Sequence, residues 1–259
     1  MLLQDRIAIV SGIGPGMGRD ISLAFAREGA HVVLAARRQA TLEEVAAEVR
    51  ALGRRALCVA TDIAQAQQCQ QLAAAAQREF GRIDILVNNA FMGGIEEPIE
   101  RVDMSAWRRL FDVNVMGSVQ LSQAVVPTMK AQGGGTIIMI NSMSMRIIEP
   151  CFGGYAASKA ALITAAQTLA RELGPYGIRV NSVVPGYIWG LSLEGYFKRL
   201  AQQRGTTPEA VYAEIASRTA LNHIPNSEEI AGAVVFFASD LSRVITGQAL
   251  DVNGGHFFH

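Results

Sequence analysis

A tyrosine and a lysine stand four residues apart in a segment otherwise built from small and apolar residues, "FGGYAASKAALITAAQ" (152–167). The segment predicts a helix, on which Tyr155 and Lys159 share one face about one turn apart. A free phenol, with a pKa of about 10, is a poor acid or base at neutral pH. Because an adjacent ammonium group favours the phenolate, the pair indicates a general acid–base tyrosine. Taken alone, the pair also fits a core tyrosine beside a lysine that extends to solvent.

A glycine-rich turn near the N-terminus is suited to holding a phosphate. "SGIGPGMGRD" (11–20) lies between a short apolar run and a helical pattern, and fits [S/T]-G-x-x-x-G-x-G rather than G-x-G-x-x-G. Glycines let the backbone approach a pyrophosphate, and a helix N-terminus offers free N–H donors. A purely structural turn is the alternative. We expect a dinucleotide to contact Ser11, Gly12, Gly14, Gly16, Met17 and Gly18.

The end of the second apolar run bears on the choice of nucleotide. NAD-binding folds of this kind usually place an acidic side chain there for the ribose 2′-hydroxyl, but this chain has Arg37 and Arg38. Guanidinium groups pair with a 2′-phosphate, whereas a carboxylate repels it. The sequence therefore predicts NADP(H) as the preferred cofactor and leaves NAD(H) open, since two solvated arginines at a strand end are the alternative.

Short runs rich in Val, Ile and Leu alternate with helical patterns along the whole chain. This alternation predicts an α/β fold, a doubly wound parallel sheet of about seven strands with helices on both faces, in a single domain spanning residues 1–259. The expected strands are 6–12, 31–36, 55–61, 83–89, 135–141, 178–184 and 247–253, and the expected helices are 16–28, 41–52, 64–80, 105–131, 155–173 and 227–238.

One segment interrupts the alternation. Residues 187–222 form a long excursion with helical pattern of its own between the sixth strand and the next helix. Such an insertion is uncommon in a compact α/β domain unless it is a lid or binding loop. We expect it to close over a substrate; a packing or subunit-contact hairpin is the alternative.

Composition narrows the range of partners. The 259 residues are 50% hydrophobic and 18% charged, with a formal net charge of zero, which gives no electrostatic reason to expect nucleic acid or a membrane surface. Cys58, Cys69 and Cys151 lack the spacing of a metal site, so no metal is expected. No run is long and apolar enough for a membrane span and the N-terminus does not resemble a secretion signal, which predicts a cytoplasmic protein.

The motifs occur in a set order that resembles the classical short-chain dehydrogenases/reductases over the whole chain. The set comprises Gly12-x-x-x-Gly16-x-Gly18, Asn88-Asn89-Ala90, Asn114, Ser142 and Tyr155-x-x-x-Lys159. Each piece is short, but the ordered set is specific. The resemblance implies a Rossmann-type fold, a nicotinamide cofactor and a homo-oligomer, either a tetramer or a dimer.

The resemblance also implies a role for each motif. Ser142 would donate to the substrate carbonyl oxygen, Tyr155 would transfer the proton, Lys159 would also hold the nicotinamide ribose, and Asn114 would organise a proton-relay water. A helix–helix polar contact is the alternative for Asn114. Further cofactor contacts are implied for Asp62, Ile63, Asn88, Ala90, Pro185, Gly186 and Ile188.

The chain departs from the family pattern at three positions. Phe91 stands where glycine usually follows Asn-Asn-Ala, Gly190 replaces a threonine that binds the carboxamide, and Pro15 replaces the basic residue of many NADPH-dependent members. The last change weakens the prediction of NADP(H). We expect Phe91 at the mouth of the active site.

The expected reaction interconverts a ketone or aldehyde and an alcohol, with NADP(H) as cofactor and a small molecule as the only partner besides other copies of the chain. The alternatives are an NAD(H)-dependent alcohol dehydrogenase of the same family and a nucleotide-sensing protein without catalysis. Enoyl reductases of the superfamily usually space their tyrosine and lysine wider than four residues. An apolar or bulky substrate is expected from a pocket of Phe91, Met92, Met143, Met145, Ile147, Phe152, Tyr187 and Trp189, although such residues are also ordinary core.

Overall fold

One parallel sheet of seven strands forms the centre of the computed structural model, which describes residues 1–94 and 96–258. The strand order is β3-β2-β1-β4-β5-β6-β7, with every pair parallel. The sequence prediction of a doubly wound, Rossmann-type sheet is therefore confirmed. The strands are β1 (Ile7–Ser11), β2 (His31–Ala36), β3 (Ala56–Ala60), β4 (Ile85–Asn88), β5 (Gly135–Ile140), β6 (Ile178–Pro185) and β7 (Ala249–Val252).

The central strands are apolar on both faces because helices cover both faces. All residues of β1 and β4 are buried, as in parallel sheets generally. The chain winds outward from β1 through β2 to β3, then crosses back to β4 on the other side of β1. The carboxyl ends of β1 and β4 therefore flank the point where the strand order reverses, and ligands bind at such a point in open α/β sheets.

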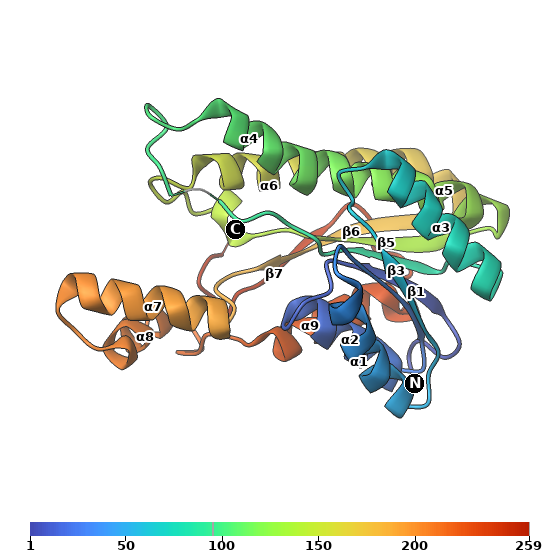
Figure 1. Cartoon of the computed structure of the whole chain (residues 1–259), viewed down its shortest axis with the longest axis horizontal. Coiled ribbons are helices and arrows are strands. Elements are labelled where there is room, and N and C mark those ends of the chain that lie inside the picture. The colour runs from blue at the N-terminus through green and yellow to red at the C-terminus, as the bar shows by residue number, and fades with distance from the viewer. Residues whose placement is uncertain (95, 259) are drawn as a thin grey trace.

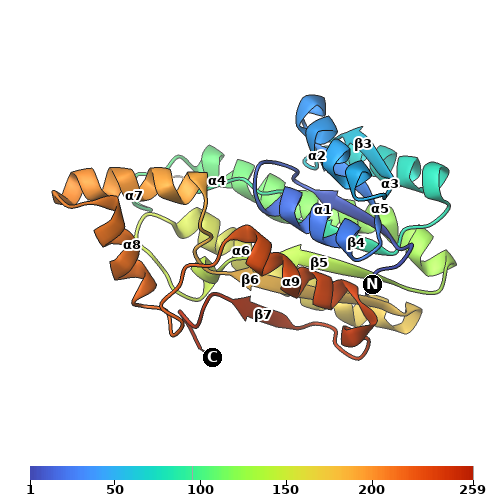
Figure 2. The same ribbon diagram turned by 90° about the horizontal axis from the view of Figure 1, so that it is seen from below.

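The helices form two layers (Figures 1 and 2). One layer contains α1 (Met17–Arg27), α2 (Gln39–Ala51) and α9 (Ser227–Ala238), which pack with one face of the sheet around Ile21, Leu42 and Val234. The other contains α3 (Ala66–Phe80), α4 (Met104–Phe111), α5 (Ser118–Ala131) and α6 (Gly153–Leu173), packed around residues such as Leu72, Leu121 and Leu162.

The helix expected over residues 105–131 is not a single α-helix. Between α4 and α5 the segment Asp112–Gly117 is a π-helix, with wider turns than the α-helices on either side. Asn114 lies in this segment and is fully buried. Single π-helical turns inside longer helices occur often at functional sites. The apolar pattern indicated a helix but could not show this local change of hydrogen bonding.

The excursion at 187–222 contains α7 (Leu191–Arg204) and α8 (Pro208–Ala216), which extend from one end of the sheet (Figures 1 and 2). They enclose a small core of their own around Phe197, Val211 and Ile215. The excursion is thus a separately packed helical hairpin rather than an irregular loop. No helix among residues 1–94 and 96–258 is long and apolar enough to cross a membrane.

Candidate active site

The turn after β1 is fixed by close backbone contacts. Gly12 has a φ of +78°, and a Cβ there would lie 2.4 Å from the Ala90 Cα. A Cβ on Gly18 would lie 2.4 Å from the Gly12 carbonyl oxygen. The Asn89 amide donates to the carbonyl oxygens of Ser11 (3.1 Å) and Gly12 (2.9 Å). Gly12 and Gly18 are therefore required by the fold itself, because any side chain would collide with backbone.

Gly14 and Gly16 have a different environment. A Cβ on either glycine would meet no atom within 4 Å, so both face open space at the start of α1. The amide groups of the first turn of α1 are free of side-chain caps. An open glycine backbone at an uncapped helix N-terminus fits the phosphates of a dinucleotide. Met17 is partly buried and packs against the core beside β1.

Ser11 lies beneath this turn rather than on its open side. Its hydroxyl donates to the Val87 carbonyl (3.2 Å) and accepts from the amides of Asn89 (3.2 Å) and Ala90 (3.3 Å). The residue is fully buried. Ser11 thus joins the ends of β1 and β4, and it places Ala90 beside Gly12.

Arg37 and Arg38 stand where β2 ends, and both are exposed. Within the part of the chain that the structure describes, neither guanidinium group has a hydrogen-bond or ion-pair partner. The backbone places them next to the glycine turn, since Gly12 and Ile13 both donate to the Ala35 carbonyl. Two unpaired cations beside an open phosphate-binding turn give this corner of the site a positive potential.

Ser142 follows β5 and caps the short 3-10 helix Met143–Met145. Its hydroxyl oxygen accepts from the amide (3.2 Å) and the hydroxyl (3.0 Å) of Ser144. The Ser142 side chain also acts on the Tyr155 phenol by hydrogen bonding, which lowers the pKa of the phenol. The serine hydroxyl thus lies close enough to the tyrosine to influence its titration, and it is itself held by Ser144.

Lys159 is buried and reaches back to the sheet. Its ammonium group donates to the Ile140 carbonyl at the end of β5 (2.8 Å) and lies 5.7 Å from the centroid of the Tyr155 ring. Burial lowers the pKa of Lys159 to about 7. The predicted arrangement of the pair on one helical face is present, and the lysine extends into the protein, not to solvent.

The electrostatic expectation for Tyr155 differs from what the structure shows. Burial is the largest influence and raises the pKa of Tyr155, while the Ser142 hydrogen bond acts in the opposite direction. A lowering by Lys159 is not among the influences on the phenol, and the lysine is itself desolvated and bonded to the Ile140 carbonyl. The phenol is thus held in its protonated form, which is the form that donates a proton.

Asn114 connects two parts of the site through its side chain. Its Oδ1 accepts from the Met92 amide (2.7 Å), and its Nδ2 donates to the Met92 carbonyl (3.1 Å) and to the Ser158 hydroxyl (3.0 Å). Ser158 in turn donates to the Tyr155 carbonyl (2.7 Å). Asn114 therefore ties the loop after β4 to the helix that carries the tyrosine.

The remaining predicted cofactor residues lie mostly at the carboxyl ends of strands. The Asp62 carboxylate, after β3, accepts from the Ala64 amide (3.0 Å), while Ile63 is buried against Gly117. The Asn88 Nδ2 donates to Ser122 (3.0 Å), and its buried Oδ1 has no hydrogen-bond partner among residues 1–94 and 96–258. Pro185 ends β6, Gly186 packs closely against Asn253, and Ile188 packs against the core that contains α1.

The predicted pocket residues fall into two groups. Phe91 lies against Tyr155 with ring centroids 6.4 Å apart, and Met143 is buried beside Gly186. Tyr187 and Trp189 instead pack against the hairpin core, where Trp189 lies 4.7 Å from Tyr212 between ring centroids. Met92, Ile147 and Phe152 occupy the loops that precede α4 and α6, and Met145 ends the 3-10 helix Met143–Met145.

Trp107 is a contact that the sequence analysis missed. A Cβ on Gly154 would lie 2.8 Å from the indole Nε1, and one on Gly153 would lie 3.3 Å from the same ring system. The indole of α4 thus lies on the backbone just before Tyr155. The glycine pair preceding Tyr155 is the signal in the sequence, but its partner, 47 residues earlier, could not be deduced from it.

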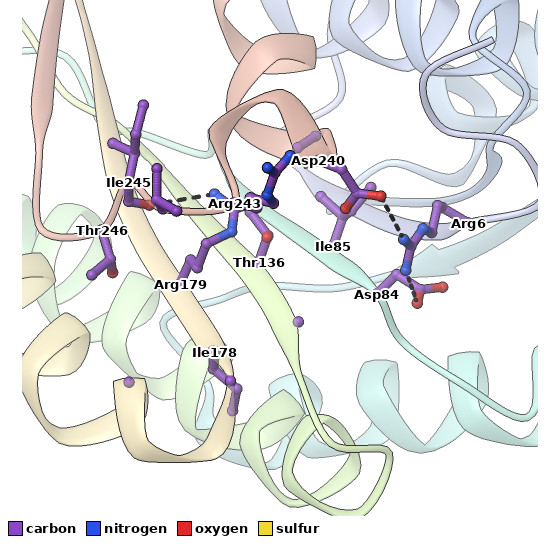
Figure 3. A pocket seen from close by; sticks show the side chains of 15 residues that line it. Arg6, Asp84, Ile85, Thr136, Ile178, Arg179, Asp240, Arg243, Ile245 and Thr246 are labelled. Atoms are coloured by element: carbon purple, nitrogen blue, oxygen red, sulfur yellow. Dashed lines mark hydrogen bonds and ion pairs between the residues drawn. The ribbon is translucent and has the colours of Figure 1, made fainter.

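A separate cleft lies at the opposite edge of the sheet, at the amino ends of β4, β5 and β6 (Figure 3). It measures about 410 Å³. Arg6 pairs there with Asp84 (3.4 Å) and Asp240 (3.5 Å). Arg179 donates to the carbonyl oxygens of Phe237 (2.9 Å) and Ser239 (3.2 Å) at the end of α9. These charged groups hold the ends of elements together, far from Tyr155.

Comparison with known proteins agrees with this geometry. Residues 12–256 match a family model of the short-chain dehydrogenases described as "Enoyl-(Acyl carrier protein) reductase". The chain is 34% identical to the 7alpha-hydroxysteroid dehydrogenase of Escherichia coli (strain K12) over 253 residues, covering 98% of this chain and 94% of that protein.

Two solved structures superpose closely. L-sorbose reductase from Gluconobacter frateurii, complexed with NADPH and L-sorbose, has a TM-score of 0.92 at 32% identity, covering 99% of this chain and 98% of that one. NAD+-bound xylitol dehydrogenase has a TM-score of 0.92 at 29% identity, covering 98% and 100%. The chain belongs to the short-chain dehydrogenase/reductase family, whose members act on alcohol and carbonyl groups with a nicotinamide cofactor.

Proposed function

We propose that this protein is an NADP(H)-dependent oxidoreductase that interconverts an apolar or bulky ketone or aldehyde and the corresponding alcohol. The observation that carries the proposal is the grouping of Ser142, Tyr155 and Lys159: Ser142 lowers the pKa of the phenol, and the Lys159 Nζ lies 5.7 Å from the centroid of the phenol ring. Ser142 follows β5, and α6 places Lys159 against the carboxyl end of the same strand, the edge at which the glycine turn opens.

Ser142, Tyr155 and Lys159 would each have a separate role in the reaction. A bound nicotinamide supplies or accepts the hydride. The Ser142 hydroxyl donates a hydrogen bond to the carbonyl oxygen and stabilises the negative charge that develops on it. Tyr155, whose pKa is raised by burial, delivers its proton to that oxygen in reduction and recovers it in oxidation. The Lys159 side chain lies near the phenol and can bind the ribose hydroxyls.

The preference for NADP(H) is supported by Arg37 and Arg38. Both are exposed beside the open glycines 14 and 16 and lack partners among the described residues, so either can pair with a 2′-phosphate. The L-sorbose reductase structure holds NADPH and the xylitol dehydrogenase structure holds NAD+, so relatives of this chain use both nucleotides.

The hairpin of α7 and α8 is proposed as a substrate lid. It stands at the end of the sheet where the strands finish, and it packs mainly within its own core, which allows it to move as a unit. Limited proteolysis at the exposed connection at 205–207 checks this proposal. Cofactor and substrate together should slow the cleavage; cleavage at an unchanged rate contradicts a lid.

Two further predictions do not rest on the contacts described above. They are a homo-oligomer and a cytoplasmic location. Exposed apolar side chains at Leu241, Val244 and Leu250 support the first of these, because a second copy could cover them. Light scattering coupled to size-exclusion chromatography decides between an oligomer and a monomer.

The reaction is tested by following nicotinamide absorbance with apolar cyclic ketones, acyclic ketones and ketose sugars, each with NADPH and with NADH. We expect the apolar ketones to be reduced fastest, and mainly with NADPH. Faster reduction with NADH would contradict the cofactor assignment alone, and faster reduction of sugars would contradict the substrate class alone.

A further inference from the structure

Phe91 is a large aromatic residue on a backbone that is held on both sides. On one side the Ala90 amide donates to Ser11 (3.3 Å). On the other, Asn114 bonds to both the amide (2.7 Å) and the carbonyl (3.1 Å) of Met92. Because both Ser11 and Asn114 are fully buried, these bonds fix the loop around Phe91 firmly. The backbone position from which the Phe91 side chain projects is therefore set by the fold.

The ring of Phe91 is presented to solvent directly beside the catalytic tyrosine. It is 63% exposed, yet it contacts Tyr155 edge to face, with ring centroids 6.4 Å apart and planes at 65°. A ligand that covers this phenyl group buries apolar surface, and the anchored backbone of the loop need not be ordered in the process. The exposed part of the ring is thus a prepared contact surface next to the reacting group.

The rest of the same loop leaves no room on the helix side of Tyr155. A Cβ on Gly94 would lie 3.0 Å from the Tyr155 Cβ and 3.5 Å from the Phe152 ring. Gly94 therefore packs directly on the tyrosine stem with Phe152 beside it. The loop contributes no charged or hydroxyl side chain at Phe91, Met92 or Gly94. At these positions the loop presents a hydrophobic surface without a side-chain group that could pair with the hydroxyl groups of a sugar.

We propose that Phe91 determines substrate specificity, its exposed ring forming one wall of the substrate site and selecting ketones whose carbonyl carbon belongs to, or adjoins, a flat apolar ring. The proposal rests on the proposed function. A planar ring can pack on the exposed part of Phe91 while its carbonyl oxygen reaches Ser142 and Tyr155. Unpaired hydroxyl groups of a polyol placed against the same ring would lose their hydrogen bonds to water, which is unfavourable.

The test compares wild type with Phe91→Gly, which installs the residue that relatives usually carry, and with Phe91→Tyr, which keeps the ring. The ligands are α-tetralone, a bicyclic aromatic ketone, and fructose, a polyhydroxy ketone. The ratio of kcat/KM for α-tetralone to that for fructose should fall about tenfold or more in Phe91→Gly, the size expected for loss of one aromatic contact. Phe91→Tyr should keep the ratio within about threefold of wild type.

A binding measurement separates failure of this proposal from failure of the proposed function. Calorimetric titration of α-tetralone into the enzyme saturated with NADP+ measures binding of the ketone beside Phe91 in the absence of turnover. The dissociation constant should rise about tenfold in Phe91→Gly while that of the nucleotide stays unchanged. Tyr176→Ala, which removes an exposed ring at the opposite edge of the sheet, is the matched control and should change neither constant.

The outcomes are distinct. Equal α-tetralone binding by wild type and Phe91→Gly, including no binding by either, overturns the role of Phe91. If wild type does not turn over α-tetralone but binding of α-tetralone is still weakened in Phe91→Gly, the proposed reaction is overturned. The role of Phe91 in ligand binding then stands. A kcat/KM ratio that is unchanged in Phe91→Gly also contradicts the proposal.

Discussion

At the scale of single residues, the site combines a buried lysine with a phenol that burial keeps protonated. The Lys159 ammonium donates to the Ile140 carbonyl, so the backbone of β5 fixes its position, and the Ser142 side chain lowers the pKa of the Tyr155 phenol. In the proposed reaction, the hydroxyl groups of Ser142 and Tyr155 would both bind the carbonyl oxygen.

The cofactor preference is tested at Arg37. Arg37→Asp replaces an unpaired cation at the end of β2 with an anion, which repels a 2′-phosphate and accepts from a 2′-hydroxyl. We expect the ratio of kcat/KM with NADPH to that with NADH to fall at least about tenfold, about 1.4 kcal/mol. Arg78→Asp, at the end of α3, is the charge-matched control. An unchanged ratio in Arg37→Asp would rule out this assignment.

Burial of Lys159 predicts a pH dependence of stability. Its pKa is about 7 in the folded protein and about 10.4 in an unfolded chain, so between these values the unfolded state binds one more proton. The difference in the free energy of unfolding between wild type and Lys159→Met should therefore rise with pH between these two values, in favour of the wild type. Below pH 7 both states are protonated and the difference is constant.

The measurement is denaturant unfolding of the cofactor-free protein and of Lys159→Met at pH 7 and pH 9. The free energy of unfolding should increase by about 2 kcal/mol more in wild type than in the variant, at a maximum slope of about 1.4 kcal/mol per pH unit. Parallel changes in the two proteins would show that the lysine is not desolvated.

At the scale of elements, the turn between β1 and α1 contains two kinds of glycine: those that the fold requires and those that leave space for a ligand. Gly12→Ala places a Cβ 2.4 Å from the Ala90 Cα at a φ of +78°, so we expect a loss of about 3 kcal/mol or failure to fold. Gly14→Ala meets open space and should change the free energy of unfolding by less than about 0.5 kcal/mol.

The two variants also differ in the expected effect on cofactor binding. Gly14→Ala should weaken nucleotide binding, because its new methyl group projects into the space assigned to the phosphates. Thermal unfolding and fluorescence titration with NADPH measure the two effects. Tight NADPH binding by Gly14→Ala would mean that the phosphates do not pass over this glycine.

The elements differ in how far the sequence determines them. Apolar runs such as the one that forms β1 identified the strands, because burial on both faces demands continuous hydrophobic sequence. The sequence did not predict the π-helical turn at Asn114. Whether an amide there bonds to the carbonyl four or five residues earlier depends on how α4 packs against α6. The position of Trp107 on Gly154 was missed for the same reason: it is a tertiary contact between distant segments.

At the scale of the whole molecule, parallel strands bring the separated motifs together at one edge. The glycine turn, Arg37, Ser142 and Pro185 follow four different strands, and α6 adds Tyr155 and Lys159. The sequence could place each motif at a strand end, and the order of motifs indicated the family. It could not show that Tyr187 and Trp189 pack into the core of the α7–α8 hairpin, because that core exists only when the two helices fold against each other.

The central claim is that Tyr155 transfers the proton in a carbonyl–alcohol interconversion. The most direct test measures NADPH oxidation with α-tetralone by wild type and Tyr155→Phe, together with NADPH binding by both. We expect kcat to fall about a hundredfold or more in the variant, with NADPH binding within about twofold of wild type. A variant that binds NADPH normally and retains wild-type turnover would show that Tyr155 does not transfer the proton.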